Sequence, residues 1–181
     1  MSLTTWYLEM TDLGDLRPAR EPEGDVRFVR VGIPSPAFSR FLYERVGGDW
    51  QWVDRLTWTP ERWRAWVDRP AVETWVLYQD GAPAGYAELE AQDDGAVEIL
   101  YFGLMPGFLG HGLGGHTLTL ALRRAWDLAD RLPGREPTRR VWLHTCSLDG
   151  EHALTNYRAR GLEIYRTTHE QVDTSTKGRV A

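Results

Sequence analysis

Hydrophobic and polar residues alternate along several short stretches of the chain, and elsewhere the hydrophobic residues recur every three to four positions. The first pattern is typical of β-strands and the second of amphipathic helices. Glycine and proline residues separate these stretches. The pattern predicts strands at about 5–10, 26–31, 73–79, 83–91, 96–104, 139–148 and 162–172, and helices at about 35–47, 59–70, 113–131 and 149–161.

Capping and turn residues support these boundaries. Thr59 stands where a helix N-cap is expected and Pro60 follows at the first helical position. Asp149 is a second candidate N-cap. Asp-Gly pairs at 80–81 and 94–95 separate three successive strands, which predicts an antiparallel meander. The element order β-β-α-α-β-β-β-α-β-α-β predicts an α/β (α+β) fold with a single mixed, mostly antiparallel sheet flanked by helices.

Length and composition narrow the class of protein. The 181 residues are 42% hydrophobic and 26% charged, which predicts one soluble domain over residues 1–181. No apolar run reaches the roughly 18–20 residues of a membrane span. The acidic N-terminal residues Glu9 and Asp12 argue against a signal peptide. The single cysteine, the scattered histidines and the net charge of −5 favour a cytoplasmic protein that binds no metal and no nucleic acid.

Five glycines lie between Gly107 and Gly115, at a predicted junction between a strand and a helix. Glycines allow positive φ angles and close approach of the backbone to a ligand. Free N–H groups at a helix start bind phosphate oxygens, so the loop predicts a pyrophosphate site, with a ligand-free tight turn as the alternative.

The spacing of Gly110, Gly112 and Gly115 also satisfies the G-x-G-x-x-G pattern of dinucleotide-binding folds. Such a loop normally opens its domain, whereas this one begins after residue 100. The acidic residue expected about 20 positions later is Asp130, which precedes the next predicted strand instead of ending it. The dinucleotide interpretation therefore stays a minor alternative, and no Gly-Lys-Ser/Thr follows to support a P-loop.

The stretch "LMPGFLGHGLGGHTL" resembles motif A of the GNAT (GCN5-related) N-acetyltransferases, and "EHALTNYRARGLEIY" resembles their motif B. The resemblance covers about residues 26–173 and implies the acyl-CoA N-acyltransferase fold. It also implies that the loop backbone holds the pyrophosphate of acetyl-CoA. The residues carried over to this role are Leu109, Gly110, His111, Gly112, Leu113, Gly114 and the adjacent Gly115.

The two motifs depart from the family pattern at two positions. Leu109 replaces the usual arginine or glutamine, and Gly150 replaces the asparagine seven residues before the motif B tyrosine. The contact of that asparagine near the pantetheine arm is then missing, or is supplied by Ser147 or Asp149.

Acyl transfer to an amine requires a proton acceptor, because an alkylammonium group with a pKa of about 10 has no free lone pair. Glu98 is the candidate base because it interrupts an otherwise apolar strand; the alternative is a structural pair with an arginine. Tyr157, the motif B tyrosine, is the candidate acid for the leaving thiolate; the alternative is core packing. By the resemblance, Leu104 lies where the strand bulges and leaves its neighbour, with its backbone facing the pantetheine and the thioester.

Other polar and aromatic residues have simpler interpretations. Glu88 and Glu90 alternate with apolar residues, which predicts a solvated strand face. His144 shares its strand parity with Trp142 and Cys146, which predicts a hydrogen-bonded core histidine, with a catalytic histidine as the alternative. Cys146 is predicted to be a core residue rather than a nucleophile. His111 is expected to face solvent or the phosphates.

Most of the nine tryptophans lie in the first half of the chain. Trp63 and Trp66, at i and i+3, are expected to pack their helix on the sheet. Trp50 and Trp52 are candidates for the acceptor site, where aromatic faces can hold a cationic amine.

The sequence thus predicts an enzyme that transfers the acetyl group of acetyl-CoA directly to a primary amine in a ternary complex. The amine is a small molecule or a peptide or protein amino group. A homodimer is left open, and no membrane partner is expected. The alternatives are a non-catalytic CoA-binding or acyl-CoA-binding module and a dinucleotide-binding oxidoreductase.

Overall fold

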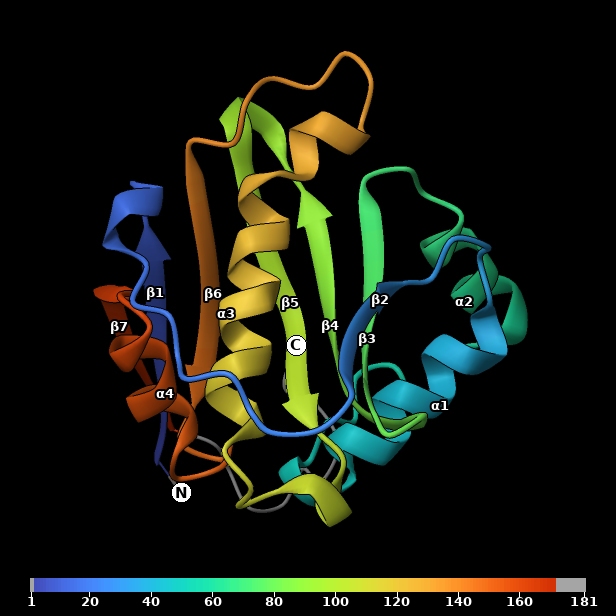
Figure 1. Ribbon diagram of the computed structural model, residues 1–181, viewed down its shortest axis with the longest axis horizontal. Coiled ribbons are helices and arrows are strands. Elements are labelled where there is room, and N and C mark those ends of the chain that lie inside the picture. Colours follow the sequence, from blue (N-terminus) through green and yellow to red (C-terminus); the bar gives the residue numbers. More distant parts are fainter. Residues whose placement is uncertain (1, 172–181) are drawn as a thin grey trace.

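The computed structural model describes residues 2–171, and its strands and helices follow the predicted order (Figure 1). The strands are β1 (Ser2–Met10), β2 (Val26–Arg30), β3 (Val72–Gln79), β4 (Ala82–Ala91), β5 (Ala96–Leu104), β6 (Arg140–Cys146) and β7 (Glu163–Gln171). The helices are α1 (Pro36–Gly47), α2 (Pro60–Val67), α3 (Leu113–Trp126) and α4 (Ala153–Ala159). Val172, the last residue of the predicted final strand, lies outside the described residues.

The seven strands form one sheet in the order β2-β3-β4-β5-β6-β1-β7. β5 and β6 run parallel, and the other neighbours run antiparallel. The prediction of a mixed, mostly antiparallel sheet is therefore confirmed. β1 is an inner strand: Tyr7 lies opposite His144 of β6 on one side and Arg166 of β7 on the other.

Helices cover both faces of the sheet. α3 crosses the front of the sheet in Figure 1, and its buried residues Leu118, Ala121 and Leu122 belong to the main core cluster, beside Leu89 of β4. α1 packs on the opposite face, where Leu42 joins a separate cluster. Because both faces of β3 and β4 are covered, most residues of these two strands are buried regardless of their parity.

The covering of both faces overturns one prediction. Glu88 of β4 is 1% exposed, and Glu90 is only partly exposed and forms an ion pair with Arg69, next to α2. The predicted solvated strand face for these two glutamates is wrong, since α2 and the loop before it lie over that face.

A segment that we call the strap, residues 11–25, joins β1 to β2 and crosses the N-terminal end of α3 (Figure 1). The backbone N–H of Ala19 donates to Thr119 Oγ1 of α3 at 3.0 Å. The backbone N–H of Arg17 donates to the carbonyl oxygen of Arg160, just after α4, at 3.0 Å. The strap is thereby fixed over both helices of this face.

The helix ends agree with the predictions in part. Thr59 caps α2 as expected, by accepting a hydrogen bond from the N–H of Arg62 at 3.2 Å. Asp149 does not cap α4, which begins only at Ala153; its carboxylate instead accepts from the N–H of Cys146 at 2.9 Å. α3 ends at Trp126, and a short 3₁₀ turn then covers the rest of the predicted helix.

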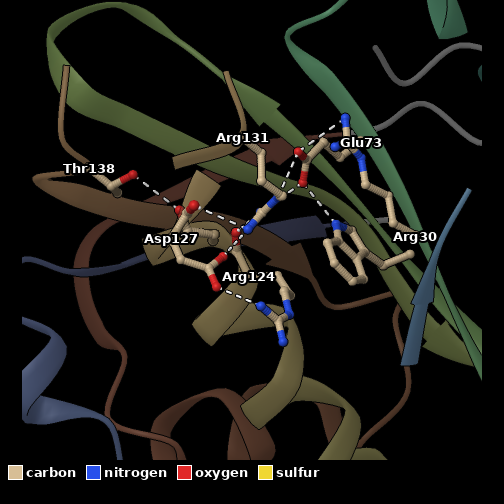
Figure 2. Close-up of polar contacts among 8 residues, drawn as sticks. Arg30, Glu73, Arg124, Asp127, Arg131 and Thr138 are labelled. Atoms are coloured by element: carbon tan, nitrogen blue, oxygen red, sulfur yellow. Dashed lines mark hydrogen bonds and ion pairs between the residues drawn. The ribbon is translucent and has the colours of Figure 1, made fainter. Parts of the chain in front are cut away.

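A buried carboxylate fixes the C-terminal end of α3 to the sheet (Figure 2). Glu73 of β3 accepts hydrogen bonds from Arg131 Nη2 and from Trp75 Nε1, both at 2.9 Å, and pairs with Arg30 Nη2 at 3.3 Å. Arg131 also pairs with Asp127. The buried charge of Glu73 is thus balanced by two guanidinium groups, at the end of α3 remote from the glycine loop.

Candidate functional site

The glycine loop between β5 and α3 has the backbone that its sequence predicts. Gly110 and Gly112 have φ angles of +81° and +76°, a region that favours glycine. Gly112 is the N-cap of α3, and no side chain caps the helix there. The first N–H groups of a helix have no partner inside the helix, and the helix dipole makes this end positive. The loop therefore presents N–H donors for an anion.

The side chains of the loop serve other purposes than its backbone. Leu109 is 44% exposed, and His111 is exposed as expected. Leu113 is fully buried against Leu104, so it offers a ligand only its N–H group. Gly114 lies at ordinary contact distance from Leu104, in the first turn of α3.

Gly115 allows two protein segments to meet. A Cβ atom at this position would lie 2.5 Å from Arg160 Nη1 and 3.0 Å from Ala19 Cβ of the strap. The third glycine of the G-x-G-x-x-G pattern is therefore explained by packing between the strap, α3 and the residue after α4.

A cavity of about 480 Å³ lies beside the glycine loop. Its walls come from the strap, the loop, α3, and the end of α4; they comprise Ala19, Arg20, Glu21, Pro22, Glu23, His111, Gly112, Gly115, Asn156 and Arg160. The buried Nε atom of Arg160 has no hydrogen-bond partner within residues 2–171. The guanidinium charge of Arg160, on the wall of a cavity beside the uncapped start of α3, suits an anionic ligand.

The strands β5 and β6 pair only along their first residues, the last pair being Glu98 opposite Trp142. Beyond this pair the two strands are not paired with each other, and we call the interval between the rest of β5 and His144 and Cys146 of β6 the opening. Leu104, at the far end of β5, still pairs with Gly85 of β4. The irregularity in the β4–β5 pairing lies at Leu100 rather than at Leu104, which corrects the predicted position of the bulge.

Tyr157 of α4 is buried at the core side of this opening, with 7% exposure, and its ring lies edge-on to Phe102 of β5 at 6.1 Å. Burial, with a smaller contribution from the charge of Asp149, raises the pKa of Tyr157 above its usual value. The phenol therefore stays protonated at neutral pH and can donate a proton.

Glu98 and His144 meet on the opposite face of the sheet. The Glu98 side chain is 8% exposed, and its Oε1 lies 3.5 Å from His144 Nδ1. Glu98 Oε2 accepts a hydrogen bond from Gln92 Nε2 at 2.7 Å. The His144 side chain is 49% exposed, so the prediction of a core histidine is wrong. Cys146 on the same strand is half-buried rather than in the core.

The two candidate tryptophans have different surroundings. Trp52 packs against Tyr101 of β5 at 4.8 Å between ring centroids, and its ring fills the space where Gly47 has no side chain. Trp50 reaches the loop after β6, because a Cβ atom added at Gly150 would lie 3.2 Å from Trp50 Cη2. An asparagine at position 150 would press on this ring, which gives the family departure at Gly150 a physical reason.

The sequence reasoning missed a buried arginine in the loop between α1 and α2. Arg55 is 4% exposed, and its Nη1 lies 2.8 Å from Oε1 of the buried Glu88. Its guanidinium carbon lies 4.7 Å from the ring centroid of Trp58, 4.5 Å from that of Trp66 and 4.4 Å from that of Tyr101. The pair fixes the loop that carries Trp50 and Trp52 onto the sheet.

Comparison with protein-family models gives a match to the acetyltransferase (GNAT) family over residues 39–162. The chain belongs to this family. The matched range includes the glycine loop, the parted strands and α4, so the GNAT assignment covers the site described above. A search of curated proteins gives no match.

Solved structures support the GNAT fold. A GCN5-related N-acetyltransferase from Kribbella flavida is 22% identical with a TM-score of 0.63, over 92% of this chain and 56% of that one. One from Sphaerobacter thermophilus is 17% identical with a TM-score of 0.63, over 91% and 49%. A tandem GNAT protein from the clavulanic acid biosynthesis pathway is 15% identical with a TM-score of 0.61, over 94% and 55%. The chain thus spans about half the length of these similar proteins.

Two further observations concern partners of other kinds. No helix within residues 2–171 has both the length and the apolar character needed to cross a membrane. The same residues contain no group of three or more histidine, cysteine, aspartate or glutamate side chains placed to hold a metal ion.

Proposed function

We propose that the protein is an acetyl-CoA-dependent N-acetyltransferase that transfers the acetyl group directly to a primary amine in a ternary complex. The observation that carries this proposal is the uncapped start of α3 at Gly112, set beside the opening between β5 and β6. One feature suits the phosphates of CoA, and the other suits the acyl-bearing arm.

The cavity beside the glycine loop fits the anionic part of CoA. The backbone N–H groups from Gly110 to Gly115 would hold the pyrophosphate, as helix starts do in other phosphate sites. Arg160 and Arg20 of the strap both line this cavity and bring positive charge to it. Glu21 and Glu23 lie on the strap wall, so the phosphates would sit on the opposite side, toward α3.

The chemistry divides between the two faces of the sheet. Tyr157 lies on the face of α3 and α4, where a protonated phenol can supply a proton to the departing thiolate. Glu98 and His144 lie on the other face, where a carboxylate and an imidazole can receive the proton of the amine. An acyl group placed in the opening would be approached by the amine from one side and left by the thiolate on the other.

The acceptor site would lie under the loop between α1 and α2. Trp50 closes this region toward the loop after β6. Asp54 of the same loop is exposed and acidic, which suits an amine that arrives as a cation. Trp52 is a packing residue of this wall rather than a free face for the substrate, since Tyr43 and Tyr101 cover it.

Two other functions were considered from the sequence. The dinucleotide-binding oxidoreductase does not agree with the fold, because that class uses a parallel doubly wound sheet, whereas this sheet is mostly antiparallel. A CoA-binding module without turnover shares every contact of the cavity. Product formation is the measurement that separates it from an enzyme.

The binding step can be tested by thermal unfolding with acetyl-CoA. At a ligand concentration 100 times the Kd, binding adds about 2.7 kcal/mol to the free energy of unfolding, which raises Tm by about 5–11 °C for a chain of this size. Gly112→Val should remove this shift. Gly134→Val is the matched control, because Gly134 has the same φ of +76° and no neighbour within 4 Å, but follows the short 3₁₀ turn after the C-terminal end of α3.

Turnover can be followed by the release of the CoA thiol with a panel of primary amines, and by mass spectrometry of the acetylated product. Thiol release that depends on the amine supports the enzyme. A thermal shift without product from any amine would identify a binding module, and no shift even at millimolar acetyl-CoA would overturn the whole proposal.

A further inference from the structure

The mouth of the opening between β5 and β6 carries two ionisable side chains of unequal exposure. Glu98 is on β5 and His144 on β6, and both lie on the face of α1 and α2, where the two strands part. The carboxylate is 8% exposed and the imidazole 49% exposed. A substrate that approaches from solvent therefore reaches His144 first.

A chain of hydrogen bonds fixes the carboxylate. Trp142 Nε1 donates to Gln92 Oε1 at 2.9 Å, and Gln92 Nε2 donates to Glu98 Oε2 at 2.7 Å. One oxygen of Glu98 is thereby occupied, and the other, Oε1, faces His144 Nδ1 at 3.5 Å. The arrangement directs Glu98 toward the imidazole rather than toward solvent.

This geometry selects the state of the imidazole. A proton on Nδ1 is favoured by the carboxylate beside it, and this leaves the lone pair of the neutral ring on Nε2. The ring is flanked by Tyr7 of β1, with centroids 5.7 Å apart, and by Trp142, at 6.3 Å. These two rings limit how far the imidazole can turn away from Glu98.

Titratable groups near His144 include Glu98 from β5, Tyr7 from β1, Cys146 two residues further along β6, and Asp54 from the loop between α1 and α2. Partial desolvation of the carboxylate of Asp54, which is still exposed, raises its pKa, and the charges of Arg55 and His144 lower it, so Asp54 lies within electrostatic reach of the imidazole. An ammonium group between Asp54 and His144 would be attracted by the carboxylates of Asp54 and Glu98. The amine nitrogen can then approach Nε2 as a hydrogen-bond donor.

We propose that His144 is the catalytic base that takes the proton from the acceptor amine, and that Glu98 is a positioning residue that orients the imidazole and stabilises its cation. This inference rests on the proposed acetyltransferase function. It assigns the amine contact to the imidazole instead of the carboxylate.

The proton balance of the step is complete without another reactant. One proton of the ammonium group passes to His144 Nε2, and the freed nitrogen lone pair forms a bond to the acetyl carbon. The carbon–sulfur bond breaks, and the thiolate takes a proton from Tyr157. A second proton leaves the amide nitrogen and restores the phenol, while the imidazolium releases its proton to water.

The experiment compares two acceptors in the same enzyme. The first is the best alkylamine of the panel, which arrives protonated at neutral pH, and the second is hydroxylamine, which arrives mostly neutral. His144→Gln should lower kcat/KM for the alkylamine by roughly 10²–10⁴-fold at neutral pH, within the usual range for a lost base. The loss should shrink at high pH, and it should be small for hydroxylamine.

Three further variants make the assignment specific. His144→Gly should regain alkylamine turnover when free imidazole is added. Glu98→Gln should lower kcat for the alkylamine less than His144→Gln does, and its effect with hydroxylamine should be small, because Glu98 acts only through the imidazole. His152→Gln is the control, since His152 is an exposed histidine beside Glu151 and outside the opening.

The outcomes separate this inference from the proposed function. An active wild type with an unaffected His144→Gln variant would overturn the inference. A loss of activity in Glu98→Gln alone would overturn it too and would show that the carboxylate is the base. A loss of the same size at every pH and with both acceptors would make His144 structural. A wild type that acetylates neither acceptor would overturn the proposed function itself.

Discussion

Replacement of Arg55 by methionine would test how the loop over the candidate acceptor site is held. Arg55 Nη1 lies 2.8 Å from one oxygen of Glu88 and 3.0 Å from the other. The side chains are only 5% and 2% exposed, so water cannot replace the guanidinium group at little cost. Methionine keeps most of the volume between Trp58, Trp66 and Tyr101 but leaves the carboxylate of Glu88 without its cation.

The expected cost follows from the burial of this pair. Removal of one partner of a buried ion pair destabilises a protein by about 3–5 kcal/mol, because the remaining charge is uncompensated. For a chain of this size, that cost lowers Tm by roughly 6–20 °C. The double variant Arg55→Met/Glu88→Gln should recover most of the loss, since the amide is neutral and can still accept the hydrogen bond from Trp66 Nε1.

The cost should also depend on pH. Burial raises the pKa of Glu88 above its usual value of 4.5, while the charge and hydrogen bond of Arg55 lower it. Without Arg55 the pKa of Glu88 in the folded state rises further. A raised carboxyl pKa favours the folded state at low pH, and this contribution is lost as the pH rises through the folded pKa. The penalty of Arg55→Met should therefore be smallest near pH 4.5 and largest at neutral pH.

Urea unfolding followed by tryptophan fluorescence measures these differences, because Trp58 and Trp66 lie beside the substituted residue. A loss below about 1 kcal/mol at neutral pH would refute the reasoning, as would a double variant no more stable than the single one. A penalty that does not change with pH would show that Glu88 is not the group left unpaired.

Gly161→Ala should cost more than the backbone strain of about 1–3 kcal/mol that any positive φ imposes on alanine, because the new Cβ would also collide with the carbonyl oxygen of Asp15. Gly81→Ala, where φ is also positive but no neighbour lies within 4 Å, is the control in urea unfolding, and equal losses in the two variants would contradict the collision. Tyr157→Phe should lower kcat by roughly 10²-fold in steady-state kinetics with an unchanged Kd for CoA, and an unchanged kcat would make the tyrosine a packing residue. Glu73→Gln should cost about 1–3 kcal/mol in urea unfolding, because the charge-assisted hydrogen bonds from Arg131 and Arg30 are weakened while Arg131 keeps Asp127 and Arg30 is partly exposed. CoA binding at the other end of α3 should not change, and an unaffected stability would show that the pairing in Figure 2 contributes little.

The order of elements could be predicted because each one has a strong local pattern. β5 has both bounds as predicted, since Asp94-Gly95 precedes it and Pro106 follows it. The start of α3 could be predicted as well, because only glycine readily adopts the φ angle found at Gly112. These features depend on residues adjacent in the chain.

The environment of Glu88 could not be predicted because it depends on a distant segment. The stretch Glu88 to Ala91 alternates as a half-solvated strand would, yet the loop with Arg55 covers it. The exposure of His144 was predicted wrongly for the opposite reason. His144 shares its strand face with Trp142 and Cys146, which suggested burial, but the helices α1 and α2 pack over β3, β4 and β5 and leave this part of β6 uncovered. Alternation shows which residues share a face and not which faces are covered.

The location of β1 between β6 and β7 has a consequence for how the chain acquires its structure. Its contacts join residues far apart in the sequence: Glu9 pairs with Arg140 across 131 positions, and the N–H of Thr4 bonds to Ser147 across 143. Pairing over such separations is slow, because a long loop must close before any contact forms.

During synthesis, at about 5–20 residues per second, β1 waits on the order of 10 s for β6 to emerge. Within residues 2–171, β7 pairs in the sheet with β1 alone. The two ends of the chain must therefore meet before the sheet is complete, so the strand synthesised first is among the last to be placed. Substitutions that weaken β1 should slow refolding more than comparable substitutions in the β3–β4 hairpin.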